Sequence, residues 1–309
     1  MEPGTATRRA TIAAATALSA LAGIAIAPDP SKSAKLELID DYSLQLSSAN
    51  EWRRAVALCP GSLEPYGGAM SADPDPDPSG EGVYPHSYER LGAQSGFHST
   101  PVLYDPTPGT TRSYQVKLQV LCGKKPGKLQ DPHAIALDVP PGTSTTLVAK
   151  CPKKSVLVGG GFQRAAFVFA GGVYPTESHA ISKTQWQASG TSFGAFGTDM
   201  VSIGYCMRSP KRKPLLQEVS ASVAIAPQQV GFATTPACPS DRRMVYSGFD
   251  TNPKQSLFFA DGNFNGDDTF TGSAYNKSAG PATLTVFGYC LKEKVIGGSL
   301  KKFTKRGPS

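Results

Sequence analysis

The chain has 309 residues and a net charge of +7, and 39% of its residues are hydrophobic while 18% are charged. The apolar content excludes wholesale disorder, and the 32 Gly and 26 Pro exclude a helical bundle or a coiled coil. A chain rich in strands and turns remains. Its moderate positive charge comes without a nucleic-acid-binding motif, so we expect no nucleic-acid partner.

The N-terminal 27 residues have the pattern of an export signal. Arg8 and Arg9 precede an apolar run that ends in Ala-Ile-Ala, a small-residue cleavage pattern. We therefore expect a signal peptide at 1–27, a short extension at 28–35 and a secreted, extracellular product; cleavage after Ala22 is an alternative. No later stretch reaches the roughly 18 apolar residues of a membrane span, so no membrane insertion is expected.

Six cysteines organise the rest of the chain in alternating long and short intervals. They are Cys59, Cys122, Cys151, Cys206, Cys238 and Cys290. The first, third and fifth are each followed by proline, and aligning the chain on them gives periods of 92 and 87 residues. A repeat at such a fixed spacing predicts three copies of one structural unit.

The same pattern of segments surrounds each Cys-Pro pair. An alternating apolar segment precedes it, at 42–46, 135–139 and 219–225. A glycine-containing cluster follows it, at 67–70, 159–162 and 247–249. A last alternating segment runs into the second cysteine of each copy, at 114–122, 201–206 and 284–290. Alternation predicts half-buried strands, and glycine within a strand predicts a bulge or a close approach of another segment.

These segments predict an all-β fold of three tandem, disulfide-stapled antiparallel modules. The modules span 36–128, 129–213 and 214–297, and a basic tail follows at 298–309. Their packing is expected to be sandwich-like, or β-prism-like with pseudo-threefold symmetry. The sequence leaves both arrangements open.

Disulfides within each module would stabilise domains of this small size. Pairing Cys59 with Cys122, Cys151 with Cys206 and Cys238 with Cys290 closes loops of 50 to 65 residues. Each such bridge is worth about 3 to 4 kcal/mol in the chain-entropy model. Exchange between neighbouring modules remains an alternative.

The combination of Cys-Pro, a Gly-Gly-Gly-Phe turn, an aromatic hairpin and a strand ending in Tyr-Cys resembles a repeat of secreted proteins from high-GC Gram-positive bacteria. It is more loosely similar to the β-prism repeats of vitelline membrane outer layer proteins. The resemblance covers most of residues 36–297 and is best for the second copy. It implies a fold and no particular activity.

An acidic segment with alternating prolines occupies 71–81 in the first module and includes Asp73, Asp75 and Asp77. Repeated proline prevents helix and ladder formation, so an extended, solvated loop is expected. The segment is either a tolerated insertion or a strap that docks on a basic partner.

Basic residues gather just after the second cysteine of each copy, which we call the closing cysteine (Cys122, Cys206 and Cys290). Their charge is complementary to that of the acidic segment. Those assigned to partner binding are Lys124, Lys125, Arg208, Lys211, Arg212 and Lys213. If the disulfides form within modules, these residues meet basic residues that follow the opening cysteines, such as Lys153 and Lys154. They are either solvated linkers or patches for an anionic partner.

Three aromatic residues, Tyr84, Tyr174 and Trp186, are candidates for stacking against a sugar, although aromatic residues in strands usually belong to the core.

A cation candidate is formed by Asp261, Asn263, Asn265 and Asp267, which have the spacing of the first half of a calcium loop. Its twelfth position is Gly272 instead of glutamate, so a polar turn is the preferred interpretation.

No catalytic residue or cofactor is assigned. Residues 190–194 match the pattern G-x-S-x-G of a hydrolase nucleophile, but strand-like segments flank them and no histidine follows.

The interpretation of the whole sequence is a secreted binding protein without catalysis. We expect an adaptor or scaffold subunit that joins other secreted proteins in an extracellular complex. The alternative is a lectin-like or cell-envelope-binding module that recognises glycan or an anionic wall polymer.

Overall fold

The computed structural model describes residues 37–47, 51, 53–91, 95–104, 112–124, 129–164, 173–192, 198–209, 215–266 and 268–292. These residues all fall within one compact unit, Ser33–Ser309. The predicted signal peptide, the N-terminal extension and the basic tail lie outside the described residues.

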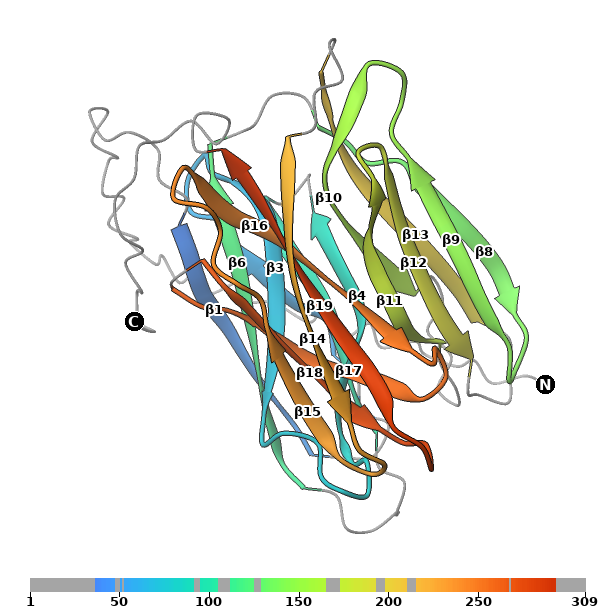
Figure 1. The fold of residues 1–309 in the computed structure, drawn as a ribbon. Helices are drawn as coiled ribbons and strands as arrows, with labels where there is room; N and C mark the ends of the chain where they lie inside the picture. Colours follow the sequence, from blue (N-terminus) through green and yellow to red (C-terminus); the bar gives the residue numbers. More distant parts are fainter. Residues whose placement is uncertain are drawn as a thin grey trace, which may run out of the picture. The chain divides into compact units, whose positions relative to one another are not determined.

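The described residues form antiparallel strands and contain no helix (Figure 1). Buried and less buried positions alternate along strands such as β19 (Ala282–Lys292), where the apolar side chains enter the core. The predicted all-β antiparallel class is confirmed, and the packing is consistent with a sandwich-like arrangement.

The strand that carries each closing cysteine lies in the middle of its group. β6 (Tyr114–Gly123) lies between β1 (Glu37–Leu46) and β3 (Glu64–Asp73), and β19 lies between β14 (Leu216–Ile225) and β16 (Arg242–Asn252). β13 (Thr198–Arg208) pairs with β10 (Ser155–Arg164) on one side and with β7 (Leu129–Gln130) and β8 (His133–Val139) on the other.

The remaining strands form three triplets. In spatial order they are β2 (Ala55–Leu58), β5 (Gly96–Tyr104) and β4 (Gly82–Leu91); β9 (Ser144–Lys150), β12 (Gln185–Ser192) and β11 (Val173–Ser182); and β15 (Val230–Thr234), β18 (Phe270–Asn276) and β17 (Leu257–Phe264). β4 pairs with β10, β11 pairs with β16, and β17 packs beside β3. Strands from different predicted modules therefore share sheets.

A bulge recurs opposite each closing cysteine. The register shifts between Pro65 and Gly67, between Leu157 and Gly159, and between Met244 and Tyr246. The residues just before these shifts pair with the three closing cysteines, Cys122, Cys206 and Cys290. In the first two copies the glycine cluster begins at the bulge, as the sequence predicts, whereas in the third copy the bulge precedes the cluster at 247–249.

The glycines also make room for aromatic rings. A Cβ atom at Gly160 would overlap the indole of Trp186, and one at Gly68 would overlap the ring of Phe97. Since both rings are buried, a larger residue at either glycine would have to displace core side chains.

All three disulfides join cysteines within one predicted module. They link Cys59 to Cys122, Cys151 to Cys206 and Cys238 to Cys290, with Cα–Cα distances of 5.6, 5.6 and 5.8 Å. This confirms the favoured pairing over exchange between modules. Three structural disulfides indicate an oxidising, extracellular-type compartment.

Candidate functional site

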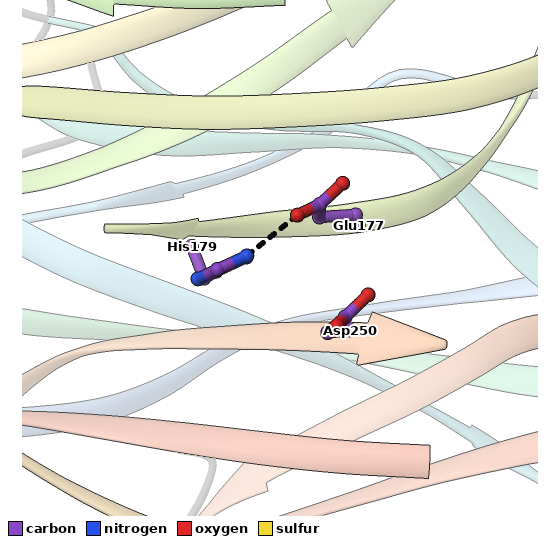
Figure 2. Close-up of side chains that lie close together, drawn as sticks. All are labelled: Glu177, His179 and Asp250. Carbon is purple, nitrogen blue, oxygen red and sulfur yellow. Dashed lines mark hydrogen bonds and ion pairs between the residues drawn. The ribbon is translucent and has the colours of Figure 1, made fainter. Parts of the chain in front are cut away.

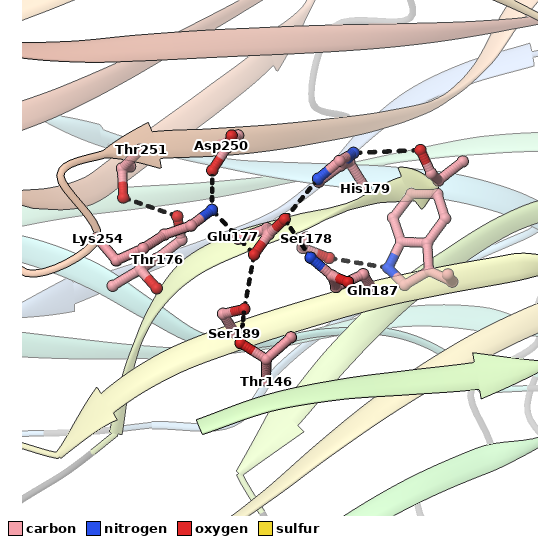
Figure 3. A network of polar contacts seen from close by, with 12 residues as sticks. Thr146, Thr176, Glu177, Ser178, His179, Gln187, Ser189, Asp250, Thr251 and Lys254 are labelled. Carbon is pink, nitrogen blue, oxygen red and sulfur yellow. Dashed lines mark hydrogen bonds and ion pairs between the residues drawn. The ribbon is translucent and has the colours of Figure 1, made fainter. Parts of the chain in front are cut away.

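The densest polar cluster surrounds the carboxylate of Glu177 on β11. Four donors point at this carboxylate (Figure 3). They are His179 Nε2 at 2.6 Å, Gln187 Nε2 at 2.6 Å, Ser189 Oγ at 2.6 Å and Lys254 Nζ at 2.9 Å. His179 shares β11 with Glu177, whereas Gln187 and Ser189 come from β12, and Lys254 follows β16. Thr146 on β9 extends the cluster through a 2.8 Å bond to Ser189.

These donors fix the charge state of Glu177. Burial raises the pKa of its carboxyl group, but hydrogen bonds from His179, Ser189 and Lys254 together lower that pKa well below the usual range. Four donors match the number of lone-pair directions that a carboxylate offers. Glu177 is therefore a saturated, ionised acceptor with no lone pair left for a substrate.

Glu177, His179 and Asp250 are also the one group of potential metal ligands found among the described residues. Their ligand atoms lie within 4.8 Å of one another (Figure 2). However, the ammonium of Lys254 forms ion pairs with both Glu177 and Asp250. The lysine supplies the positive charge that a cation would bring, so the cluster acts as a clasp between β11 and β16, strands of two predicted modules.

The predicted sugar-stacking residues are not available to a sugar. Tyr84 and Trp186 have no exposed surface and Tyr174 exposes 8%. The Trp186 indole donates to Ser178 Oγ at 3.0 Å, and the rings of Tyr84 and Tyr174 pack edge to face, 6.1 Å apart. This prediction is wrong, because other side chains pack on these rings: Phe258 stacks on Tyr174, and Tyr289 packs against Trp186.

The acidic segment is less extended than the sequence predicts. Asp77 Oδ1 accepts from the amides of Ser79 and Glu81, which closes a turn, and its other oxygen lies 3.4 Å from the guanidinium of Arg112. The Pro78 carbonyl accepts from the Tyr275 hydroxyl at 3.1 Å. Only Asp73 and Asp75 of the three predicted docking carboxylates are exposed. Asp77 instead holds the segment against the body of the protein.

The basic clusters are described in part. Lys124 and Arg208 are exposed, and Lys154 lies beside the end of β13 because its carbonyl accepts from Ser209 N at 2.8 Å. Lys153, Lys154 and Arg208 therefore gather near the Cys151–Cys206 bridge. The other assigned residues lie outside the described residues; they are Lys125, Lys211, Arg212 and Lys213.

The first two residues of the calcium candidate lie in a strand. Asp261 and Asn263 lie within β17, where Asp261 accepts a hydrogen bond from Ser273. Asn263 and Asn265 bond to each other through Asn263 Nδ2, and the Asn265 amide donates to Thr269 and Thr271. Asp267 lies outside the described residues. Asp261, Asn263 and Asn265 are thus hydrogen-bonded to one another or to residues 269–273, and the chain turns after β17 at Gly266, which agrees with the preferred polar turn.

The serine of the G-x-S-x-G pattern lies in a strand. Ser192 is the last residue of β12 and its side chain is fully buried, while Phe193 and Gly194 lie outside the described residues. A nucleophile elbow needs an exposed hydroxyl, which this buried serine does not offer.

An exposed apolar strand edge was missed by the sequence interpretation. β8 pairs only with β13 among the described strands, and its Ile135 and Leu137 side chains are 56% and 73% exposed. In the third predicted module, the residue that corresponds to Ile135 is Ser222 on β14. Ser222 pairs with Thr285 of β19, just as Ile135 pairs with Val201 of β13. Comparing the aligned copies residue by residue would have found this apolar replacement.

No protein-family model matches the chain, and no curated protein is similar to it in sequence. The described residues contain no helix with the length and apolar character needed to cross a membrane.

Proposed function

We propose that this protein is a secreted, non-catalytic binding protein that joins protein partners in an extracellular assembly. The observation that carries the proposal is the β8 edge with its two exposed apolar side chains. Proteins normally protect such edges with charge, proline or a covering segment. No second described strand pairs with β8, and its exposed Ile135 and Leu137 suit a partner that buries both.

The proposed contact is strand addition. A partner strand would pair with the backbone of β8, and its side chains would pack on Ile135 and Leu137. The exposed carboxylates of Asp73 and Asp75 and the basic residues Lys124 and Arg208 are further docking groups in this proposal. The three disulfides and the signal-like N-terminus support an extracellular setting.

The test is affinity capture of partners from the culture fluid of the producing organism, with the wild-type chain and two variants as bait. Ile135→Ser combined with Leu137→Ser should reduce the yield of captured protein about tenfold or more, which corresponds to about 1.4 kcal/mol. Phe232→Ser is the matched control because Phe232, on β15, is 50% exposed. Equal capture by all three baits would refute the assignment to β8, and the absence of any protein partner would refute the adaptor function.

Binding to an anionic wall polymer is the second candidate, favoured by the exposed group of Lys153, Lys154 and Arg208. Attraction between exposed charges is screened by salt. Retention on isolated cell walls should therefore fall between about 50 and about 300 mM salt, and Lys153→Gln with Lys154→Gln should weaken it. Retention that is insensitive to salt would argue against this function.

A further inference from the structure

A pocket of about 380 Å³ lies where the end of β11 meets the start of β14. Its walls are mainly apolar and include Leu157, Ala180, Leu216 and the buried ring of Tyr289. Glu218 contributes a carboxylate. These residues come from two predicted modules, 129–213 and 214–297, so the pocket belongs to the junction between them.

The junction between the first two predicted modules has the same construction. Arg90 and Ala180 stand six residues after Tyr84 and Tyr174, in the two copies of Gly-Val-Tyr-Pro. The Arg90 amide donates to the Tyr205 hydroxyl at 2.5 Å, and the Ala180 amide donates to the Tyr289 hydroxyl at 2.8 Å. Each tyrosine directly precedes a closing cysteine, so the two positions are equivalent.

Arg90 fills the first junction with its own side chain. Its Nε donates to the Pro65 carbonyl at 2.9 Å, and its guanidinium lies 2.7 Å from the Glu64 carboxylate and 3.6 Å from that of Asp131. The Arg90 side chain is only 5% exposed. The first junction thus encloses a guanidinium between two carboxylates and a backbone carbonyl.

The second junction has residues that correspond to Pro65 and Asp131, but it lacks the arginine. Leu157 pairs with Cys206 as Pro65 pairs with Cys122. Glu218 follows Gln217, the partner of Cys290, as Asp131 follows Gln130, the partner of Cys206. Ala180 reaches only to Cβ, which leaves the space open.

Glu218 forms no ion pair with any of the described residues. Partial burial raises the pKa of its carboxyl group, while the nearby His179 lowers it. At the corresponding place in the third predicted module, Phe264 is buried and its amide donates to Gln119 Oε1 at 2.8 Å. Phe264 therefore fills its own position with a side chain, as Arg90 does, and of these three corresponding positions Ala180 alone leaves space.

The geometry points to this pocket as a receptor for the side chain of an arginine that a protein partner presents, in the place that Arg90 takes at the first junction. The apolar walls suit the three methylene groups of arginine, and the Glu218 carboxylate accepts from its guanidinium. The inference rests on the proposed protein-binding function and adds the chemistry of the docking residue.

Two features limit the strength of this contact. Val156 takes the place of Glu64, so the second junction offers one carboxylate where the first offers two. The exposed Lys183 also lines the pocket, and its positive charge opposes a cationic guest. Lys183→Gln should therefore tighten binding.

A direct test uses N-acetyl-arginine methylamide as the probe, with the full chain lacking its signal segment. NMR titration should shift the amides of Ala180 and Tyr289. The arginine probe should bind about tenfold more tightly than the citrulline analogue, which has the same shape without the charge. Glu218→Gln, at an exposed position, should abolish this preference without affecting the fold. Equal binding of both probes, or shifts confined to other strands, would overturn the inference.

A second variant connects the pocket to the partner. Ala180→Arg should fill the pocket from within, block the probe and reduce partner capture, whereas Ser220→Arg, on β14 outside the pocket lining, should do neither. The assignment to a partner would be overturned if Ala180→Arg left the capture of partner unchanged. It would also be overturned if the probe bound only after residues 293–309 had been removed. Probe binding without any captured protein would instead refute the adaptor function and leave the pocket's preference intact.

Discussion

The hydroxyl of Tyr289 accepts a hydrogen bond from the backbone amide of Ala180, 109 positions earlier in the chain, across the boundary between two predicted modules. Tyr289 is 1% exposed, so water does not compete for this contact. Tyr205 and Arg90 form the same contact at the preceding boundary. Hydroxyl groups placed next to closing cysteines therefore satisfy amides of the neighbouring strand group.

Removing this hydroxyl should destabilise the fold. In Tyr289→Phe the ring remains, but the Ala180 amide loses its acceptor, which should cost about 1 to 3 kcal/mol. Tyr205→Phe should cost a similar amount. The free energies of unfolding are measured by denaturant titration, with Tyr104→Phe as a control at a partly exposed ring. Wild-type stability for both variants would contradict the assigned role.

Glu177→Gln should weaken the clasp between β11 and β16. The 4% exposed carboxylate loses its charge while Lys254 and His179 keep their donors, so we expect a loss of about 2 to 4 kcal/mol at pH 7. The folded-state pKa of Glu177 lies below its unfolded value of 4.5, so its stabilising contribution is present above that pH and is lost as the pH falls. The difference between wild type and variant should accordingly shrink in acid. A difference that is independent of pH would contradict this account.

Asp261 should show the opposite dependence. Burial raises its pKa to about 6, despite hydrogen bonds from Ser273 and from the backbone of Ala72. Because the folded value exceeds the unfolded value of 3.8, the protonated form stabilises the fold below about pH 4 and this contribution is lost as the pH rises through 6. Asp261→Asn should therefore gain about 2 kcal/mol relative to wild type between pH 4 and pH 7. Unfolding measured at both pH values checks this, and an equal effect at both would refute it.

Gly160→Ala tests the close approach of an aromatic ring. Its added methyl group would overlap the buried Trp186 indole, so a loss of about 1 to 3 kcal/mol is expected. Gly266→Ala is the control, since no atom lies within 4 Å of a Cβ at that glycine. Thermal unfolding should separate the two variants by several degrees. Equal melting temperatures would show that the core adjusts to the methyl group.

The predicted modules should not fold separately. Residues 129–213 contribute β10, which pairs with β4 as well as β13, and β11, which pairs with β16 as well as β12, so excision leaves each strand without one of its two neighbours. The excised segment should lack dispersed amide signals in NMR even with Cys151 and Cys206 joined. Cooperative unfolding of this segment would establish it as an independent domain.

The sequence predicted features that depend on neighbouring residues. Alternation at 219–225 and 284–290 predicted β14 and β19, and the glycines after Cys151 predicted the bulge in β10. The disulfides followed from the repeat because each module brings its own pair of cysteines. These features follow from local sequence patterns, and the packing of the strands against one another does not change them.

The candidate site depends on contacts that no local pattern encodes. Lys254 reaches Glu177 only because β11 pairs with β16, and part of the cover of Trp186 is Tyr289, a residue of another predicted module. The first half of the calcium pattern lies in a strand for a related reason: Asp261 and Asn263 follow the alternation of β17, which competes with the turn that a cation loop needs. Ile135 and Leu137 were read as part of a half-buried strand because exposure depends on what lies beside β8.

The placement of β17 beside β3 sets the order in which the chain can be completed during synthesis. Residues 64–73 leave the ribosome early, yet the segment that flanks them, 257–264, follows almost 200 residues later. β11 must likewise await β16. A nascent chain that stops before residue 242 therefore holds β3 and β11 without these neighbours, and a terminated product of that length should be a target for proteases and aggregation, although two of its three disulfides could already have closed.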